Sequence, residues 1–426
     1  MLIEFSVSNF RSFREKQTFS MVAAPRLHKR ENVFSPKIKG EKFFDLLKVA
    51  AVYGPNASGK SNLLKAMNVI RRIADSTPHV SNFIAVSPFR FDRELLDQPS
   101  NFEIHFVHEE TRYQFDLSAT SERIVRERLI NFSAGKPAVL YERHYKEGVG
   151  DAYSFGDHLE GGDTLHQAWC RLTGPTSMFL SQAVANSNED LKQLRVPFEW
   201  LTNRCTVIDV ELPFFTNISE DLVKLNPKFA NSVASFLDEI DVPVTSVRVE
   251  AIASSGSAPV SHKYLEGDIN NLTQEFRSEL RSKSKTTFTH RTALGDADFD
   301  LSEESQGTKG LVGFWAPWVL LSNQPRALSI IAIDELDSSL HPEIVVSLVK
   351  RHLNLEEPAQ FIFTTHDTHL MDAKILRRDQ FWLTERDING ATQLRSIHEF
   401  EGRESEDIEK RYYEGRYRGL PILRKG

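Results

Sequence analysis

The stretch Gly54-Pro-Asn-Ala-Ser-Gly-Lys-Ser61 fits the pattern G-x-x-x-x-G-K-[ST] without a mismatch. An apolar run, residues 46–53, precedes it and is typical of a buried strand. Leu63, Met67 and Ile70 follow it at helical spacing. Strand, glycine-rich loop and helix are the context in which this pattern marks a phosphate site. The alternative, a tight turn without function, does not account for both flanks.

The chemistry of such a loop assigns roles to its residues. Glycines let successive backbone N–H groups converge on a phosphate, and the helix N-terminus adds partial positive charge. Lys60 is expected to reach the β- and γ-phosphates of a nucleotide, and Ser61 to ligate Mg²⁺. The residues predicted to bind the nucleotide in this loop are Asn56, Ala57, Ser58, Gly59, Lys60, Ser61 and Asn62.

Composition narrows the class of protein. The chain has 426 residues, enough for two or more cores, with 40% hydrophobic and 26% charged residues. The net charge of −7 gives no global reason to expect nucleic-acid binding, although a local basic face stays open. Two cysteines, Cys170 and Cys205, form neither a disulfide framework nor a metal cluster, which favours a reduced, cytoplasmic protein. No apolar run approaches the roughly 20 residues that span a bilayer, so we expect no membrane association.

A second motif is the apolar strand at residues 328–333, which ends in Asp334 and Glu335. Asp334 is expected to hold the magnesium through water, opposite Ser61. Glu335 is expected to orient or deprotonate the attacking water. A buried strand that ends in a solvated acidic turn is a common alternative, and a complete phosphate loop in the same chain disfavours it.

Two further residues are ambiguous when taken alone. His366 ends the apolar strand at residues 360–365, where a histidine is more often structural, yet in the same sheet it fits a γ-phosphate sensor. Arg11 stands between Phe10 and Phe13, and the simpler reading is a surface arginine flanked by two core phenylalanines. The sharper reading places Arg11 near the nucleotide.

The rest of the chain indicates which segments form strands, helices and loops. Residues 2–7 read as a strand, and residues 102–117 read as a hairpin, which suggests a mixed sheet. Helical patterns dominate from about 155 to 270, with a helix that begins at Asn226-Pro227 and a flexible loop at 252–259. The basic and aromatic tail, residues 411–425, is either a nucleic-acid or partner surface or a solvated terminal helix.

Together the motifs resemble the ABC-type ATPases of the SMC, RecF and OLD group, and most of all short ATP-binding proteins of bacterial anti-phage and abortive-infection loci. The resemblance covers both ends of the chain well and the middle poorly. The motifs that carry it are Asn9-Phe-Arg-Ser-Phe13, the phosphate loop, Ser305-Gln-Gly-Thr308, Ile333-Asp-Glu-Leu-Asp-Ser-Ser-Leu-His-Pro342 and Thr364-Thr-His-Asp367.

The resemblance implies an α/β fold, an ABC-type head that is split in sequence, with a mixed sheet and an inserted, mostly helical lobe. The implied division is residues 1–150 and 281–426 for the two halves of the head and 151–280 for the lobe. It also implies ATP and Mg²⁺ as ligands, with Lys60, Glu335 and His366 as catalytic residues.

The resemblance further implies a composite site. Ser305, Gly307 and Thr308 look like the signature motif, which contacts the γ-phosphate bound by the opposite subunit of a head-to-tail homodimer. The sequence departs there from Ser-Gly-Gly-Gln. Asp337 matches the D-loop and His366 the switch histidine. The glutamine of the Q-loop has two candidates, Gln182 and, less favoured, Gln114.

Three functions follow. The first is an ATPase that senses infection and controls a separate toxin or nuclease effector. OLD-family nucleases carry a Toprim domain after the ATPase, whereas 60 residues follow His366 here. The second is a RecF-like DNA-repair ATPase that binds DNA as an ATP-dependent dimer. The third is a non-hydrolysing ATP-dependent scaffold, against which the intact Glu335 argues.

Overall fold

The computed structural model describes most of the chain. The described residues are 1–75, 83–188, 191–208, 213–225, 228–251, 284–323, 328–338, 340–371, 374–403 and 406–417. The predicted helix cap at Asn226-Pro227, the predicted loop at 252–259 and the tail from residue 418 lie outside them. In the described part of the chain, no helix is long and apolar enough to cross a membrane.

A six-stranded sheet carries the phosphate loop, with strands in the order β11-β15-β16-β5-β17-β18. The first five strands are parallel, and β18 runs antiparallel to β17, so the predicted mixed sheet is confirmed. The three central strands β15, β16 and β5 are buried along their whole length, as is usual for parallel strands covered on both faces. The strands are β11 (Cys205–Ile208), β15 (Ile330–Ile333), β16 (Gln360–Thr364), β5 (Val49–Tyr53), β17 (Phe381–Arg386) and β18 (Thr392–Ser396).

The predicted strand at 2–7 and the predicted hairpin at 102–117 are both present, but they lie in a second, separate sheet. This sheet is antiparallel, with the order β10-β9-β8-β7-β6-β1-β2. Alternation in a sequence shows that a strand has two different faces, and it does not show which strand it pairs with. The strands are β1 (Leu2–Ser8), β2 (Gln17–Ser20), β6 (Ser100–His108), β7 (Thr111–Ala119), β8 (Ile124–Ser133), β9 (Lys136–Lys146) and β10 (Gly150–Phe155).

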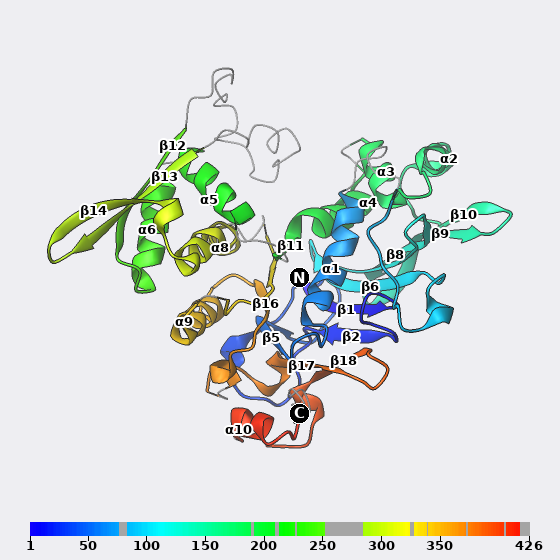
Figure 1. Cartoon of the computed structure of the whole chain (residues 1–426). Helices are drawn as coiled ribbons and strands as arrows, with labels where there is room; N and C mark the ends of the chain where they lie inside the picture. Colours follow the sequence, from blue (N-terminus) through cyan, green and yellow to red (C-terminus); the bar gives the residue numbers. More distant parts are fainter. Residues whose placement is uncertain are drawn as a thin grey trace.

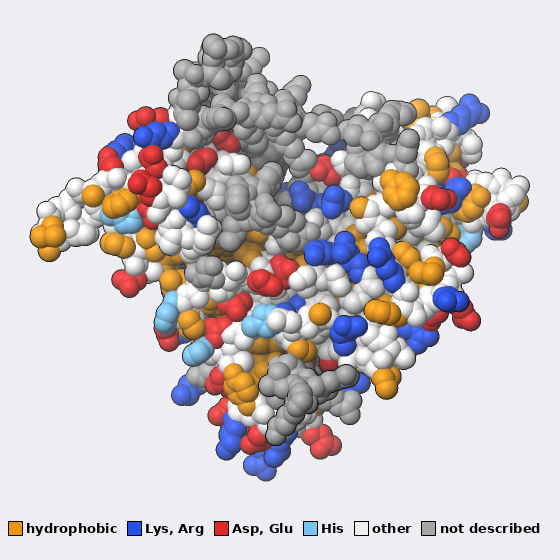
Figure 2. Space-filling view, viewed as in Figure 1, with side chains coloured by type: hydrophobic (Ala, Val, Ile, Leu, Met, Phe, Trp, Pro, Cys, Tyr) orange, Lys and Arg blue, Asp and Glu red, His pale blue; other side chains and the backbone are white. Residues whose placement is uncertain are grey.

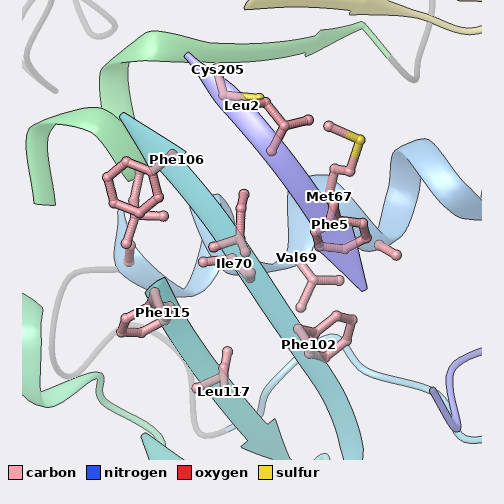
Figure 3. Packing of buried hydrophobic residues seen from close by; sticks show 14 of the residues in the cluster. Leu2, Phe5, Met67, Val69, Ile70, Phe102, Phe106, Phe115, Leu117 and Cys205 are labelled. Atoms are coloured by element: carbon pink, nitrogen blue, oxygen red, sulfur yellow. The ribbon is translucent and has the colours of Figure 1, made fainter. Parts of the chain in front are cut away.

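Helix α1 (Lys60–Ala74) packs between the two sheets. Its side chains Met67, Val69 and Ile70 meet Phe5 of β1 and Phe102 of β6 in one apolar cluster (Figure 3). The same cluster contains side chains from β5, β15 and β16, so it spans both sheets. The sheets therefore fix the position of α1, and with it the position of the loop at its N-terminus.

The opposite face of the six-stranded sheet is covered by a second cluster. Side chains alternate along β5, so that Ala50 and Val52 enter the first cluster while Val49, Ala51 and Tyr53 enter the second. Figure 1 shows the covering helices together with a small three-stranded sheet on one side of the molecule. These elements are α5 (Pro213–Leu225), α6 (Lys228–Glu239), α8 (Gln306–Asn323), α9 (Pro342–Leu353), β12 (Val244–Ala251), β13 (Ser284–Thr292) and β14 (Gly295–Asp300).

The stretch 151–280 contains helices, as predicted, but it also supplies a strand of the six-stranded sheet. Its first helices, α2 (Gly162–Leu172), α3 (Phe179–Ala185) and α4 (Lys192–Glu199), pack into the cluster around α1. Strand β11 then pairs with β15. The division of the chain at residues 150 and 280 stays a prediction.

Candidate nucleotide-binding site

The loop between β5 and α1 has the backbone that a phosphate site needs. Gly54, Ala57 and Gly59 all have positive φ angles of 149°, 61° and 110°. Gly59 is the N-cap residue, and Lys60 is the first residue of the helix. Backbone N–H groups in such a turn face one concave side, where the helix terminus adds positive charge.

Two threonines of the β17–β18 hairpin form hydrogen bonds to the loop. Thr392 Oγ1 donates to the carbonyl of Ser58, over 2.7 Å, and Thr384 Oγ1 lies 2.5 Å from Ser58 Oγ. Both glycines of the loop are needed there, because a Cβ on Gly54 would collide with Thr384 and one on Gly59 with Thr392. Neither threonine belongs to a motif that the sequence reveals, because each bonds to the loop from a strand that is distant in the chain.

Replacing Gly59 with alanine is expected to destabilise the protein more than the same change at Gly148. Both residues have positive φ, so both variants carry backbone strain. A Cβ on Gly148 would meet nothing within 4 Å, whereas one on Gly59 would collide with Thr392 and lie 2.9 Å from Ser12 Oγ. Overpacking of this kind costs about 1–3 kcal/mol in free energy of unfolding. Chemical denaturation of the two variants measures the difference, and equal losses would contradict the packing of the hairpin on the loop.

Lys60 lies where the ends of β5 and β16 meet. Its ammonium donates to the carbonyl of Gly54 over 2.9 Å and lies 3.0 Å from Nε2 of His366. Burial lowers the pKa of Lys60, and the nearby carboxylates Asp334, Glu335 and Asp337 act in the opposite direction. The predicted lysine and the predicted histidine are therefore brought into direct contact.

The two predicted carboxylates follow β15 directly and are positioned by Thr364 of the neighbouring strand. Thr364 Oγ1 donates to Asp334 Oδ1 over 2.6 Å and accepts the backbone N–H of Glu335 over 2.8 Å. Glu335 has φ of 52°, a left-handed backbone that turns the chain sharply at this point. The Glu335 side chain is exposed at the sheet edge, where a water molecule has access to it.

His366 and Asp337 link the loops after β16 and β15. The backbone N–H of His366 donates to Asp337 Oδ2 over 3.2 Å. Burial, and then the charge of Lys60, lower the pKa of His366, which favours the neutral imidazole near pH 7. Neutral Nε2 can accept a proton from Lys60 in a hydrogen bond. Figure 2 shows acidic, histidine and basic side chains next to one another near the centre of this face.

Ser61 and Asp334 are the residues that could hold a magnesium ion together with a nucleotide. Both offer oxygen atoms, which Mg²⁺ prefers, and such ions take one or two protein ligands together with phosphates and water. Among the described residues, no group of three or more His, Cys, Asp or Glu could hold a metal by itself. A dedicated metal cage is thus not found there, and a nucleotide-linked ion is the kind that the donor set fits.

Arg11 lies beside the phosphate loop. It lines a cavity together with Ala57 and Asn62, and Asn62 Nδ2 donates to Ser12 Oγ over 2.8 Å. The exposed Asn56 lies in the same turn as Ala57. Arg11 is exposed and is flanked by the buried Phe10 and Phe13, as the simpler reading expected. It also lies next to the phosphate loop, although β1 belongs to the other sheet, and its place near the nucleotide stays a prediction.

The predicted signature residues lie at the start of α8. Ser305 Oγ accepts the backbone N–H of Thr308 over 3.0 Å, which caps the helix, and Gly307 lies between them. This end of α8 packs on α5, where Thr216 Oγ1 donates to the carbonyl of Lys309. Within the described ranges, no hydrogen bond or ion pair joins residues 305–308 to residues 54–61. Within one chain, no described contact joins the predicted signature residues to the phosphate loop.

In the described part of the chain, neither candidate for the Q-loop glutamine has a hydrogen bond to the phosphate loop. Gln182 is buried in α3, and its neighbour Ser181 donates to the carbonyl of Ala74, at the far end of α1. With a rise of 1.5 Å per residue, that end lies about 20 Å from Lys60. Gln114 is in β7 of the antiparallel sheet and donates to Asp116.

Comparison with known proteins identifies the family. Residues 49–149 and 193–372, well over half of the chain, match the family described as "AAA domain, putative AbiEii toxin, Type IV TA system". The chain therefore belongs to this family and has a P-loop ATPase domain. No curated protein matches the chain.

Solved SMC head structures are similar to the chain at low identity. One is the SMC head bound to the C-terminal winged-helix domain of ScpA, with TM-score 0.45 and 12% identity, covering 93% of this chain and 97% of that one. Another is the SMC head domain from Thermotoga maritima, with TM-score 0.41 and 15% identity, covering 93% of this chain and 98% of that one. A third is the Smc head domain with an extended coiled coil, bound to the C-terminal domain of ScpA derived from Pyrococcus furiosus. Its TM-score is 0.42 at 13% identity, and the match covers 93% of this chain and 97% of that one.

Proposed function

We propose that this member of the AAA-domain family binds ATP with Mg²⁺ on residues 54–61 and hydrolyses it. One observation carries the proposal. Three segments far apart in the chain converge at one sheet edge. There the Lys60 ammonium lies 3.0 Å from Nε2 of His366, and the charges of Asp334 and Glu335 act to raise the pKa of Lys60. A cation for the terminal phosphates and carboxylates for metal and water are the groups that phosphoryl transfer to water requires.

Each residue then has one task. Lys60 binds the β- and γ-phosphates in place of the Gly54 carbonyl that it now contacts. Ser61 and Asp334 would hold Mg²⁺, which neutralises phosphate charge when bound. Glu335 orients the attacking water and accepts its proton. His366, held by Asp337, lies next to Lys60 and contacts the γ-phosphate.

A single chain provides these groups on one side of the γ-phosphate. We place the missing donors in a second copy, whose Ser305, Gly307 and Thr308 would close the site in a head-to-tail dimer. Ser305 and Gln306 are exposed at the start of α8, where the helix N-terminus is suited to an anion. Their separation from the phosphate loop within one chain supports this arrangement.

Mixed dimers test the composite site. Lys60→Ala and Ser305→Arg chains, co-expressed with different tags, would form dimers in which one site carries both lesions and the other carries neither. We expect each variant alone to be inactive and the mixed dimer to recover toward about half of the wild-type ATPase rate, because one of two symmetric sites is intact. Phosphate release from doubly affinity-purified dimers is the measurement. Normal hydrolysis by Ser305→Arg alone would show that residues 305–308 are only a helix cap.

We further propose that the ATP-bound dimer controls a separate effector protein in a bacterial defence system. The support is the description of the family, which names a putative toxin and a toxin–antitoxin system. A reduced, cytoplasmic location fits that role. The neighbouring genes are the simplest test, since the absence of any toxin or nuclease gene beside this one would count against the proposal.

A further inference from the structure

A cavity of about 430 Å³ lies beside the phosphate loop. We propose that it holds the base of the bound nucleotide, which stacks on Phe91 and Arg386. This inference rests on the proposed ATP site and assigns the base-recognition residues of that site. The volume is in the range of small-molecule pockets, about 300–1,000 Å³.

Four segments build the cavity. They are the turn after β1, the phosphate loop with the start of α1, the loop that precedes β6, and the β17–β18 hairpin. The residues that line it are Arg11, Ser12, Ala57, Asn62, Ser87, Pro88, Arg90, Phe91, Arg386 and Gly390. Two of these segments, the phosphate loop and the hairpin, are the same ones that the two threonines join.

The walls are held in place before any ligand binds. Asn9 is buried, and its Oδ1 accepts the backbone N–H of Phe89 over 3.0 Å while its Nδ2 donates to the carbonyl of Gln98 over 2.9 Å. The backbone N–H of Arg11 donates to Ser87 over 2.7 Å. These bonds fix the loop that carries Phe91 against the turn that carries Arg11, and a prepared wall lowers the entropy cost of binding.

The position of the cavity matches the direction of a bound nucleotide. The γ-phosphate end is fixed at Lys60, which lies beside His366. Asn62 lies in the first turn of α1, one residue beyond Ser61, which would hold Mg²⁺. The backbone of such a loop surrounds the α- and β-phosphates, so the side of the loop at Asn62 faces the α-phosphate. The cavity begins at Asn62 and Ala57, and His366 is not among the described residues that line it. Ribose and base, which follow the α-phosphate, therefore enter this cavity.

The chemistry of the walls is suited to the flat face of a base. Phe91 is 73% exposed, which is unusual for a phenylalanine, and the Arg386 guanidinium lies 6.0 Å from its ring centroid. A Cβ on Gly390 would lie 3.3 Å from the same ring, so glycine keeps this wall open. Aromatic rings and guanidinium planes both stack on bases.

The cavity recognises the base by its face rather than by its edge. Its charged lining residues, Arg11, Arg90 and Arg386, are all hydrogen-bond donors, and no carboxylate is among the described residues that line it. The polar lining groups, which are the hydroxyls of Ser12 and Ser87 and the amide of Asn62, can each donate or accept, so they can pair with the edge of either purine. We therefore expect GTP to bind within about 10-fold of ATP, because stacking is tolerant of the base.

Calorimetry with ATP and with inorganic tripolyphosphate tests the assignment. Phe91→Ala is expected to weaken ATP binding by between about 5- and 100-fold, the range for loss of one stacked base. Tripolyphosphate has no base, so its affinity should be unchanged. Phe91→Trp keeps a flat ring and should bind ATP as the wild type does. Phe44→Ala is the matched control, because Phe44 is 67% exposed and lies outside the cavity.

The outcomes separate this inference from the ATP site itself. If Phe91→Ala binds ATP as the wild type does, or loses ATP and tripolyphosphate equally, the base does not stack there. A GTP affinity lower than that of ATP by about 1,000-fold or more would also overturn the inference, since losses of that size come from selective contacts to the edge of the base rather than from stacking on its face. If the wild type binds neither ATP nor tripolyphosphate, the result contradicts the proposed phosphate site itself rather than the position of the base.

Discussion

Glu335→Gln is expected to leave ATP bound and to slow its hydrolysis by roughly 100-fold or more, the scale of a lost general base. Glutamine keeps the size of the side chain and removes the negative charge that polarises water. The backbone should not change, because Thr364 holds the N–H of residue 335 rather than its side chain. Asp334 keeps its own bond to Thr364, so the predicted magnesium position is unaffected.

Single-turnover hydrolysis and equilibrium binding, measured on the same preparation, separate the two effects. Glu343→Gln is the matched control, because it makes the same chemical change in the first turn of α9, outside the site. We expect the control to hydrolyse ATP normally. Unreduced turnover by Glu335→Gln would place the base elsewhere, and His366 would be the next residue to test.

Lys60→Ala is expected to weaken ATP binding by at least about 100-fold. Hydrogen bonds to charged groups contribute about 1.5–3 kcal/mol each. Two such bonds to the terminal phosphates correspond to at least about 3 kcal/mol, or more than 100-fold in Kd at about 1.4 kcal/mol per tenfold. Calorimetric titration with ATP gives the affinity, and unchanged binding would exclude the phosphate-loop assignment.

A control is needed because Lys60 also bonds to the loop itself, through the carbonyls of Gly54 and Pro55. Lys65→Ala removes the same charge from the same helix, α1, one turn beyond the loop. It should bind ATP as the wild type does. Comparison of the thermal midpoints of the two variants then shows how much of the Lys60→Ala effect comes from a less stable loop.

The sequence was sufficient for elements whose signal is local. The strand before Gly54, the helix after Lys60 and the apolar strands before Asp334 and His366 all form as predicted. In each case a continuous apolar run or a 3.6-residue period lies within a few residues of the polar motif that ends it. In the structure these polar ends meet, because the strands are parallel and end at one edge of the sheet.

What the sequence could not supply is the set of partners across long separations. Thr384 and Thr392 hold the phosphate loop from more than 300 positions away, and each looks like an ordinary strand residue. Phe91 lies in a loop of no recognisable motif, and only the fold places it beside Ala57. The hairpin at 102–117 was assigned to a mixed sheet, because alternation does not report the neighbour of a strand.

Phosphate release from ATP, measured for the wild-type chain and for Lys60→Ala purified in the same way, tests the central claim most directly. If this chain hydrolyses ATP at residues 54–61 with Glu335, the wild type releases phosphate in the presence of Mg²⁺, and Lys60→Ala stays at the background of the assay. Equal rates from the two preparations, or no release by a folded wild type in its assembled form, would contradict the claim.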